Sequence, residues 1–94
     1  MSIYLTAIIK IKPETKAELQ TLLLNMVVQS RKEDACIQYD LHDCKEEDLF
    51  IFWEEWKDQA GLDLHNKREY ISDFVSKSSQ LTDGIVIHKT DKIA

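Results

Sequence analysis

A carboxylate and an imidazole, accompanied by two indoles, stand out in the stretch Leu49–Tyr70. Glu54 directly follows the apolar run Leu49–Trp53, and His65 lies on the segment after it. Imidazole is the side chain whose ordinary pKa lets it accept and return a proton near neutral pH. A carboxylate in apolar surroundings either finds a hydrogen-bond donor or keeps its proton. Glu54 and His65 are therefore our candidates for a small proton-handling pocket.

The same residues also have ordinary structural explanations. A histidine near the carboxyl end of a helix suits the helix dipole in its cationic form, and Glu54 could be a rim carboxylate paired at a strand end. Trp56 shares the strand face of Glu54 whereas Trp53 lies on the opposite face, so Trp56 is the better pocket candidate. Tyr70 either presents its hydroxyl to the same space or belongs to the apolar stripe of a helix.

The sequence predicts no metal site and no nucleophile. His42 and His88 each lack a second histidine or cysteine at ligand spacing. Cys36 and Cys44 lack the close pairing of zinc and redox motifs, and we expect them to be reduced thiols. Ser78 and its neighbour Ser79 form no nucleophile motif.

Length, composition and charge limit the function classes. Ninety-four residues make one domain, 1–94, and 44% hydrophobic content is typical of a globular chain. A net charge of -5, with no basic cluster interleaved with aromatics, argues against nucleic acid as a partner. The longest apolar run, Leu49–Trp53, is far short of the roughly 20 residues needed to span a bilayer, and the amino terminus has no signal pattern. We expect a cytoplasmic protein with no membrane partner.

The elements that must position these residues follow from periodicity. Alternating apolar residues predict a first strand over 3–12, and Pro13 suits the first turn of a helix. The i, i+3, i+4 spacing predicts that helix over 14–32 and two more over about 58–66 and 68–81. Alternation predicts a second strand around 37–42, an unbroken apolar start predicts a central strand over 49–56, and a last strand follows over 85–89.

The resulting order, βαββ(αα)β, predicts an α+β domain: a ferredoxin-like, antiparallel four-stranded sheet with helices on one face. The uncovered face of this sheet would carry apolar side chains. A second copy of the chain is the simplest cover for such a face, so we expect a homodimer.

The middle of the chain resembles the antibiotic biosynthesis monooxygenase family. The resemblance rests on the run Trp53–Asp58 followed by Ala60, Leu62 and His65, which is similar to the family's pattern of an aromatic, a Glu, a second aromatic and a later His. Two flanking stretches agree with it, Ser30–Tyr39 and Lys12-Pro13. The departures are Glu14 and Ala35, where the family often has glycine, and Tyr70, where many members have a second histidine.

The resemblance implies a dimeric α+β barrel with a pocket in each protomer between sheet and helices. It also implies oxidation of quinols or phenolic compounds by dioxygen without flavin, haem or metal. In this scheme His65 is the base, Glu54 orients it, and Trp56 with Tyr70 holds the substrate ring. Further candidates for substrate contact are Phe50, Tyr39 and Phe74.

Three functions remain open from the sequence. The first is a cofactor-independent monooxygenase acting on a small quinol or phenolic substrate. The second is an isomerase of a small metabolite, which needs the same proton acceptor but no oxygen. The third is a dimeric ligand-binding or stress-associated protein without turnover.

Overall fold

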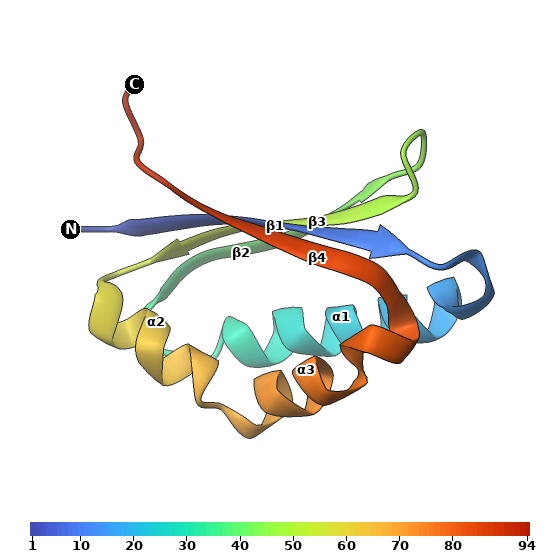
Figure 1. The fold of residues 1–94 in the computed structure, drawn as a ribbon. Coiled ribbons are helices and arrows are strands. Elements are labelled where there is room, and N and C mark those ends of the chain that lie inside the picture. Colours follow the sequence, from blue (N-terminus) through green and yellow to red (C-terminus); the bar gives the residue numbers. More distant parts are fainter.

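The computed structural model describes residues 1–94 as one sheet and one layer of helices (Figure 1). A single 3-10 turn at Pro13–Thr15 precedes the first helix. The elements in chain order are β1 (Ile3–Ile11), α1 (Lys16–Ser30), β2 (Cys36–Cys44), β3 (Leu49–Trp56), α2 (Gln59–Asn66), α3 (Glu69–Leu81) and β4 (Thr82–Thr90).

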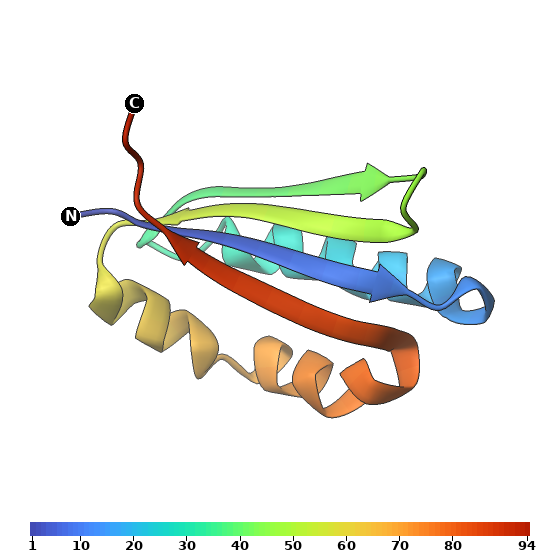
Figure 2. The same cartoon turned by 45° about the horizontal axis from the view of Figure 1, so that its top comes forward.

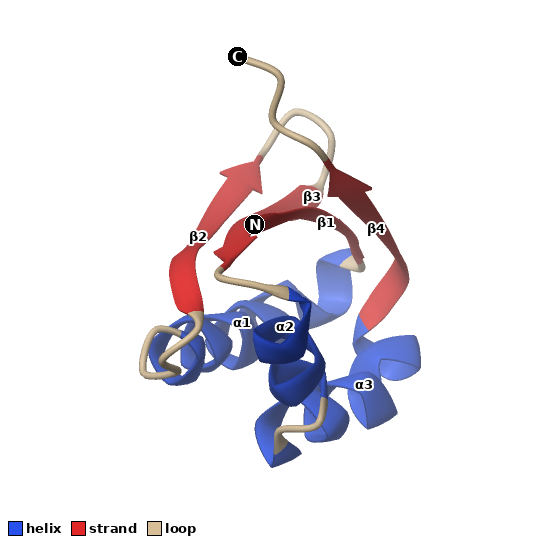
Figure 3. Ribbon diagram, turned by 90° about the vertical axis from the view of Figure 1, so that its left-hand side faces the viewer, coloured by secondary structure: helices blue, strands red, loops and turns tan.

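The four strands form an antiparallel sheet in the order β2-β3-β1-β4, visible in Figure 2 as four ribbons side by side. All three helices cover one face, and the edge strands β2 and β4 bend down toward them (Figure 3). The predicted α+β, ferredoxin-like architecture is thus confirmed, with β3 in a central position. None of the three helices combines the length and the hydropathy that a membrane-spanning helix requires.

The period-two pattern places the inner and outer faces as predicted. On β3, Phe50, Phe52, Glu54 and Trp56 are all buried against the helices, whereas Trp53 on the opposite face is 47% exposed. Side chains that alternate along a strand point to opposite faces, so one helix-covered face accounts for this difference. The core between the two layers is built around these β3 side chains together with Ile9, Leu19 and Leu23.

Several predicted boundaries were wrong by two residues or more. Helix α1 begins at Lys16 rather than Glu14, because Pro13 starts a 3-10 turn first, and it ends at Ser30 rather than Lys32. Strand β2 continues to Cys44, past the predicted end at His42. Strand β4 begins at Thr82 rather than Ile85: the Thr82 hydroxyl donates to the Ser78 carbonyl at 2.8 Å, which ends α3 while the backbone of Thr82 is already extended. Residues 82–84, which lie between the predicted helix and the predicted strand, therefore belong to β4, and the chain passes directly from helix to strand.

Candidate functional site

A mostly apolar cavity of about 150 Å³ lies between the sheet and helices α2 and α3. A cavity of about this size accepts benzene in another protein, so the space suits one small ring. Its rim includes Val75 and Ile87, which are 63% and 62% exposed. Eleven of the fourteen lining residues are hydrophobic; the lining consists of Leu5, Ala7, Ile9, Met26, Tyr39, Phe52, Glu54, His65, Asn66, Ile71, Phe74, Val75, Ile85 and Ile87.

Helix α2 carries His65 into the wall of this cavity. The Asp58 side chain caps the helix by accepting a hydrogen bond from the Gly61 N–H at 2.8 Å. At the other end of α2, His65 is only 4% exposed. Its ring packs on the indole of Trp56, with 4.2 Å between ring centroids, and lies 5.7 Å from the ring of Tyr39. The imidazole is therefore fixed by aromatic contacts as well as by its polar partner.

The polar partner of His65 is Glu33, from the loop between α1 and β2. Glu33 Oε2 lies 2.8 Å from His65 Nδ1. This contact assigns the proton to Nδ1 as long as the carboxylate is ionised, because an ionised carboxylate can only accept. Nε2 makes no hydrogen bond, and no fully buried side-chain nitrogen or oxygen of the chain lacks a partner, so Nε2 is not fully buried. We infer that it faces the cavity, because His65 lines that cavity and Nδ1 is turned to Glu33. Burial lowers the pKa of His65 and outweighs the opposing effect of Glu33.

Glu54 is the second ionisable group on the cavity wall. It comes from β3, is 8% exposed, and accepts a hydrogen bond at 2.9 Å from Nε1 of Trp56, two residues along the same strand face. Burial raises the pKa of Glu54 to about 7, against the smaller opposing effect of the Trp56 hydrogen bond. Near neutral pH this carboxyl group is thus able either to donate or to accept a proton.

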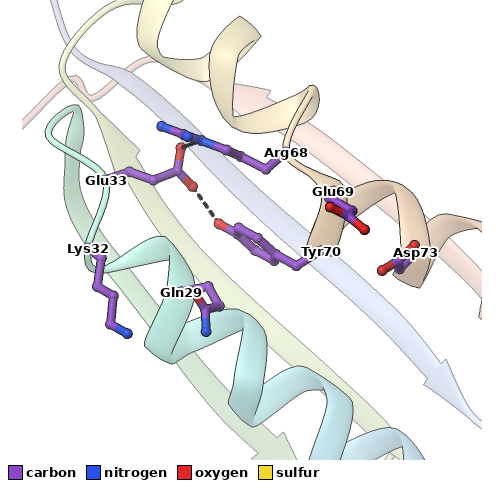
Figure 4. Close-up of a pocket in the computed structure, with 7 residues that line it drawn as sticks. All are labelled: Gln29, Lys32, Glu33, Arg68, Glu69, Tyr70 and Asp73. Atoms are coloured by element: carbon purple, nitrogen blue, oxygen red, sulfur yellow. Dashed lines mark hydrogen bonds and ion pairs between the residues drawn. The ribbon is translucent and has the colours of Figure 1, made fainter.

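The carboxylate of Glu33 accepts further hydrogen bonds in a polar depression that shares no lining residue with the cavity (Figure 4). The Tyr70 hydroxyl donates to Glu33 Oε2, and Arg68 Nε donates to Oε1 at 3.2 Å. The Ser30 hydroxyl lies 2.9 Å from the Tyr70 hydroxyl. Burial alone would raise the pKa of Glu33, but the hydrogen bonds from Tyr70 and His65 prevail and lower it. Glu33 is therefore held as a carboxylate.

The family model for antibiotic biosynthesis monooxygenases matches residues 2–77. The chain belongs to the antibiotic biosynthesis monooxygenase family. It is 39% identical over 80 residues to the Bacillus subtilis protein "Putative monooxygenase YcnE", and the match covers 84% of each chain.

Solved structures share the fold of this chain. The structure of PA3566 from Pseudomonas aeruginosa is 32% identical with a TM-score of 0.91, over 99% of this chain and 95% of that one. The structure of Rv0793 from Mycobacterium tuberculosis has a TM-score of 0.94 at 19% identity, over 100% and 97% of the two chains, which is a likeness of fold alone.

The predicted site residues do not all meet in one place. His65, Glu54, Tyr39 and Phe74 line the common cavity. Trp56 does not, because its indole is completely buried beneath His65.

Phe50 and Tyr70 also lie off the cavity wall. Phe50 lies near the start of β3 and is 1% exposed, and the Lys16 ammonium lies 5.8 Å from its ring centroid. Tyr70 turns its hydroxyl to Glu33 and lines a separate polar depression with Arg68. The predicted substrate contacts from Trp56, Phe50 and Tyr70 are therefore not direct ones in this structure.

The predicted partnership between Glu54 and His65 is replaced by one between Glu33 and His65. Glu54 is bonded to Trp56, whereas His65 is bonded to Glu33, a residue that no sequence pattern marks as part of a site. Glu33 lies in a run of charged residues, Arg31–Asp34, that looks like an exposed break. The one hint in the sequence is that Ser30, a polar residue, follows Met26 and Val27 at the spacing of the apolar stripe of α1; the structure shows that Ser30 is buried there. No cluster of three or more potential metal ligands is present.

Proposed function

We propose that this protein is a monooxygenase that oxidises a small quinol or phenolic compound with dioxygen. The observation that carries the proposal is the pair of environments on the two sides of His65. Nδ1 is held by Glu33, while Nε2 is open toward an apolar cavity that suits one ring. Membership of the family, and the name of the Bacillus subtilis relative, support the same class of reaction.

The first step is removal of a phenolic proton by His65 Nε2. A neutral imidazole with its proton on Nδ1 presents a lone pair at Nε2, which is the form that a general base requires. The imidazolium that results remains next to the Glu33 carboxylate, 2.8 Å from Nδ1. The apolar lining excludes water from the electron-rich phenolate, so the anion meets dioxygen rather than solvent protons.

The electrons for dioxygen come from the substrate in this scheme. The phenolate gives one electron to dioxygen, and the resulting radical pair combines to form a carbon–oxygen bond. Loss of the ring proton and cleavage of the oxygen–oxygen bond leave one oxygen atom on the ring and release the other as water. For a hydroquinone the balanced products are a hydroxyquinone and one water, so no separate reductant is consumed.

An isomerase is the second candidate, and the environment of Glu54 favours it. Glu54 lines the same cavity as His65, and its pKa of about 7 makes it a second group able to transfer a proton near neutral pH. Removal of a proton by one group and its return by the other would move a double bond or a carbonyl without oxygen. The two candidates share the base and differ in whether dioxygen is consumed.

Oxygen uptake on a panel of quinols separates the functions. For the monooxygenase we expect one dioxygen consumed per substrate and one labelled oxygen atom in the product under ¹⁸O₂. His65→Gln should reduce the rate by about 100-fold or more, because general-base catalysis contributes about 10²- to 10⁴-fold. His88→Gln, on the outer face of β4, is the matched control and should retain the rate.

The other outcomes decide against the proposal in different ways. Turnover of a substrate under strict anaerobiosis, lost in His65→Gln, would establish the isomerase instead. Saturable binding of aromatic compounds without turnover would leave a ligand-binding protein. Equal rates in His65→Gln and the unmodified chain would remove the imidazole from the mechanism.

A further inference from the structure

Glu33 and His65 meet across a gap of 32 residues in sequence, and their contact separates two kinds of space. On one side of the imidazole is the apolar cavity. On the other is a polar depression lined by the Glu33 carboxylate, Arg68 and Tyr70 (Figure 4). A hydrogen bond made by one imidazole nitrogen fixes which chemistry the other nitrogen can perform.

We propose that Glu33 is the positioning residue of this site: by accepting the Nδ1 proton of His65 it directs the Nε2 lone pair into the cavity. The catalytic consequence rests on the proposed function, in which Nε2 is the base. The tautomer itself does not, because it follows from the contact of 2.8 Å and can be observed without any substrate. Glu33 touches no cavity space, so it acts only through His65.

The surroundings of Glu33 suit a permanent anion. Three donors converge on its two oxygens: His65 Nδ1–H and the Tyr70 hydroxyl on Oε2, and Arg68 Nε–H on Oε1. Because the Tyr70 proton is directed to Glu33, the 2.9 Å contact between Tyr70 and Ser30 requires the Ser30 hydroxyl to be the donor. The network therefore runs in one direction, from Ser30 through Tyr70 to the carboxylate.

The same network explains why Tyr70 is not the group that sets the tautomer. Its hydroxyl lies 3.3 Å from His65 Nδ1, further than the Glu33 oxygen. The hydroxyl already uses its proton toward Glu33, and a tyrosine oxygen would have to compete with a charged acceptor for the Nδ1 proton. Tyr70 thus holds Glu33, and Glu33 holds His65.

The protonation of His65 depends on all the polar and titratable groups that are packed around its ring. These groups are Glu33 from the loop before β2, Arg68 before α3, Tyr70 on α3, Tyr39 on β2 and Glu54 on β3. Of these, only Glu33 makes a charged hydrogen bond to the ring. Its removal should therefore have the largest effect on the balance between imidazole and imidazolium.

Nitrogen-15 NMR of the histidine side chains tests the proposal directly. The chain has three histidines, and His65→Gln identifies the His65 signals by their loss. At pH 8, where the ring is neutral, we expect the Nδ1–H tautomer in the unmodified protein. In Glu33→Gln the amide NH₂ can donate to Nδ1, so the population should move to the Nε2–H tautomer. Glu69→Gln, in the same depression but without a bond to His65, should change nothing.

Steady-state kinetics test the effect of Glu33 on catalysis. Glu33→Gln should lower kcat on the order of 100-fold with little change in KM, since a wrong tautomer removes the base but not the cavity. The acidic limb of the kcat/KM profile should move to lower pH, because the imidazolium loses its anionic partner. Glu33→Asp should recover part of the rate.

Failure of the proposal for Glu33 and failure of the proposed monooxygenase function give different results. An unmodified protein with His65 in the Nε2–H tautomer overturns the proposal even if Glu33→Gln does not fold. Loss of the Nδ1–H tautomer in Tyr70→Phe, which keeps the carboxylate, would overturn it by giving the role to Tyr70. The expected tautomers together with no oxygen uptake on any quinol would leave Glu33 as the positioning residue and refute the monooxygenase.

Discussion

Glu33 is bonded to His65, Glu54 lines the same cavity as His65, and the environments of these two carboxyl groups move their pKa values in opposite directions. Glu54 is buried and accepts a hydrogen bond from one neutral donor only, so burial prevails and raises its pKa to about 7. Burial also acts on Glu33, but donors that include Tyr70, His65 and Arg68 lower its pKa below the ordinary value. Groups with pKa values pushed apart by their environment are typical of acid and base pairs at active sites.

The raised pKa of Glu54 predicts a pH dependence of stability. A carboxyl group whose pKa is higher in the folded state than in the unfolded chain stabilises the fold at low pH, and this contribution is lost as the pH rises. The window runs from the ordinary value of 4.5 to about 7. A difference of this size corresponds to about 3 kcal/mol of unfolding free energy.

We therefore expect Glu54→Gln to be as stable as the unmodified protein near pH 5 and more stable by about 1 to 3 kcal/mol at pH 8. The glutamine oxygen can still accept the Trp56 hydrogen bond but carries no charge to bury. Urea unfolding at the two pH values and one protein concentration measures the difference. Glu55→Gln, one residue along on the opposite face, should keep the pH trend of the unmodified protein. Parallel pH trends in both variants would show that Glu54 is not the titrating group.

The placement of helix α2 depends on a close approach to the loop that carries Glu33. A Cβ atom added at Gly61 would lie 2.2 Å from the Cβ of Ala35. The Ala35 carbonyl also accepts a hydrogen bond from the Lys57 N–H at 2.8 Å, which ties the same loop to the end of β3. Gly61 thus allows the helix of His65 and the loop of Glu33 to pack together.

Gly61→Ala should destabilise the protein by about 2 kcal/mol, because overpacking costs about 1 to 3 kcal/mol. In an unobstructed helix the same change would be stabilising, by up to about 1 kcal/mol. Chemical denaturation measures the effect, and His65 nitrogen-15 shifts report whether the contact with Glu33 has moved.

Ala35→Gly in the Gly61→Ala background removes the atom that clashes and is the matched rescue. The nearest remaining neighbour would then be Asp58 Oδ1 at 3.2 Å, a side-chain atom that can adjust. We expect the double variant to recover most of the lost stability. If the changes in unfolding free energy of the two single variants simply add in the double variant, the cost of Gly61→Ala does not come from the contact with Ala35.

The sequence was sufficient to predict a strand or helix, and its buried face, where a single periodicity determined both. The alternation of β1 and the burial of the Phe50 face of β3 follow from one covered face of a sheet. The start of β4 was not predictable in this way, because Thr82 closes α3 and opens the strand at once. Glu33 was not predictable either, since its partners come from α2 and α3 and become neighbours only in the folded chain.

The whole molecule is a flat body of about 39 × 31 × 18 Å with an uncovered sheet face. Trp53 on β3 and Val86 on β4 are 47% and 44% exposed on that face, and Ile8 and Ile51 lie half-buried between them. An apolar surface shared by several strands is typical of an interface. We expect a second copy of the chain to cover it, as the resemblance to dimeric α+β barrels implies.

Trp53→Lys should therefore convert a dimer into a monomer in solution. A lysine at the centre of the face would put an unpaired ammonium into an apolar contact, which costs several kcal/mol unless the interface opens. Sedimentation equilibrium measures the mass directly. The scattering of the monomer should agree with the Cα radius of gyration of 13.1 Å, whereas the unmodified protein should give a larger value.

Leu24→Lys is the matched control, because Leu24 is 50% exposed on α1 in the helix layer, away from the sheet face. It introduces the same charge at a similar exposure and should leave the dimer intact. If both variants become monomeric, the interface includes the helices, and the outer sheet face alone does not define it. If the unmodified protein is already a monomer at micromolar concentration, the exposed indole of Trp53 needs a different partner, and each cavity must act within a single chain.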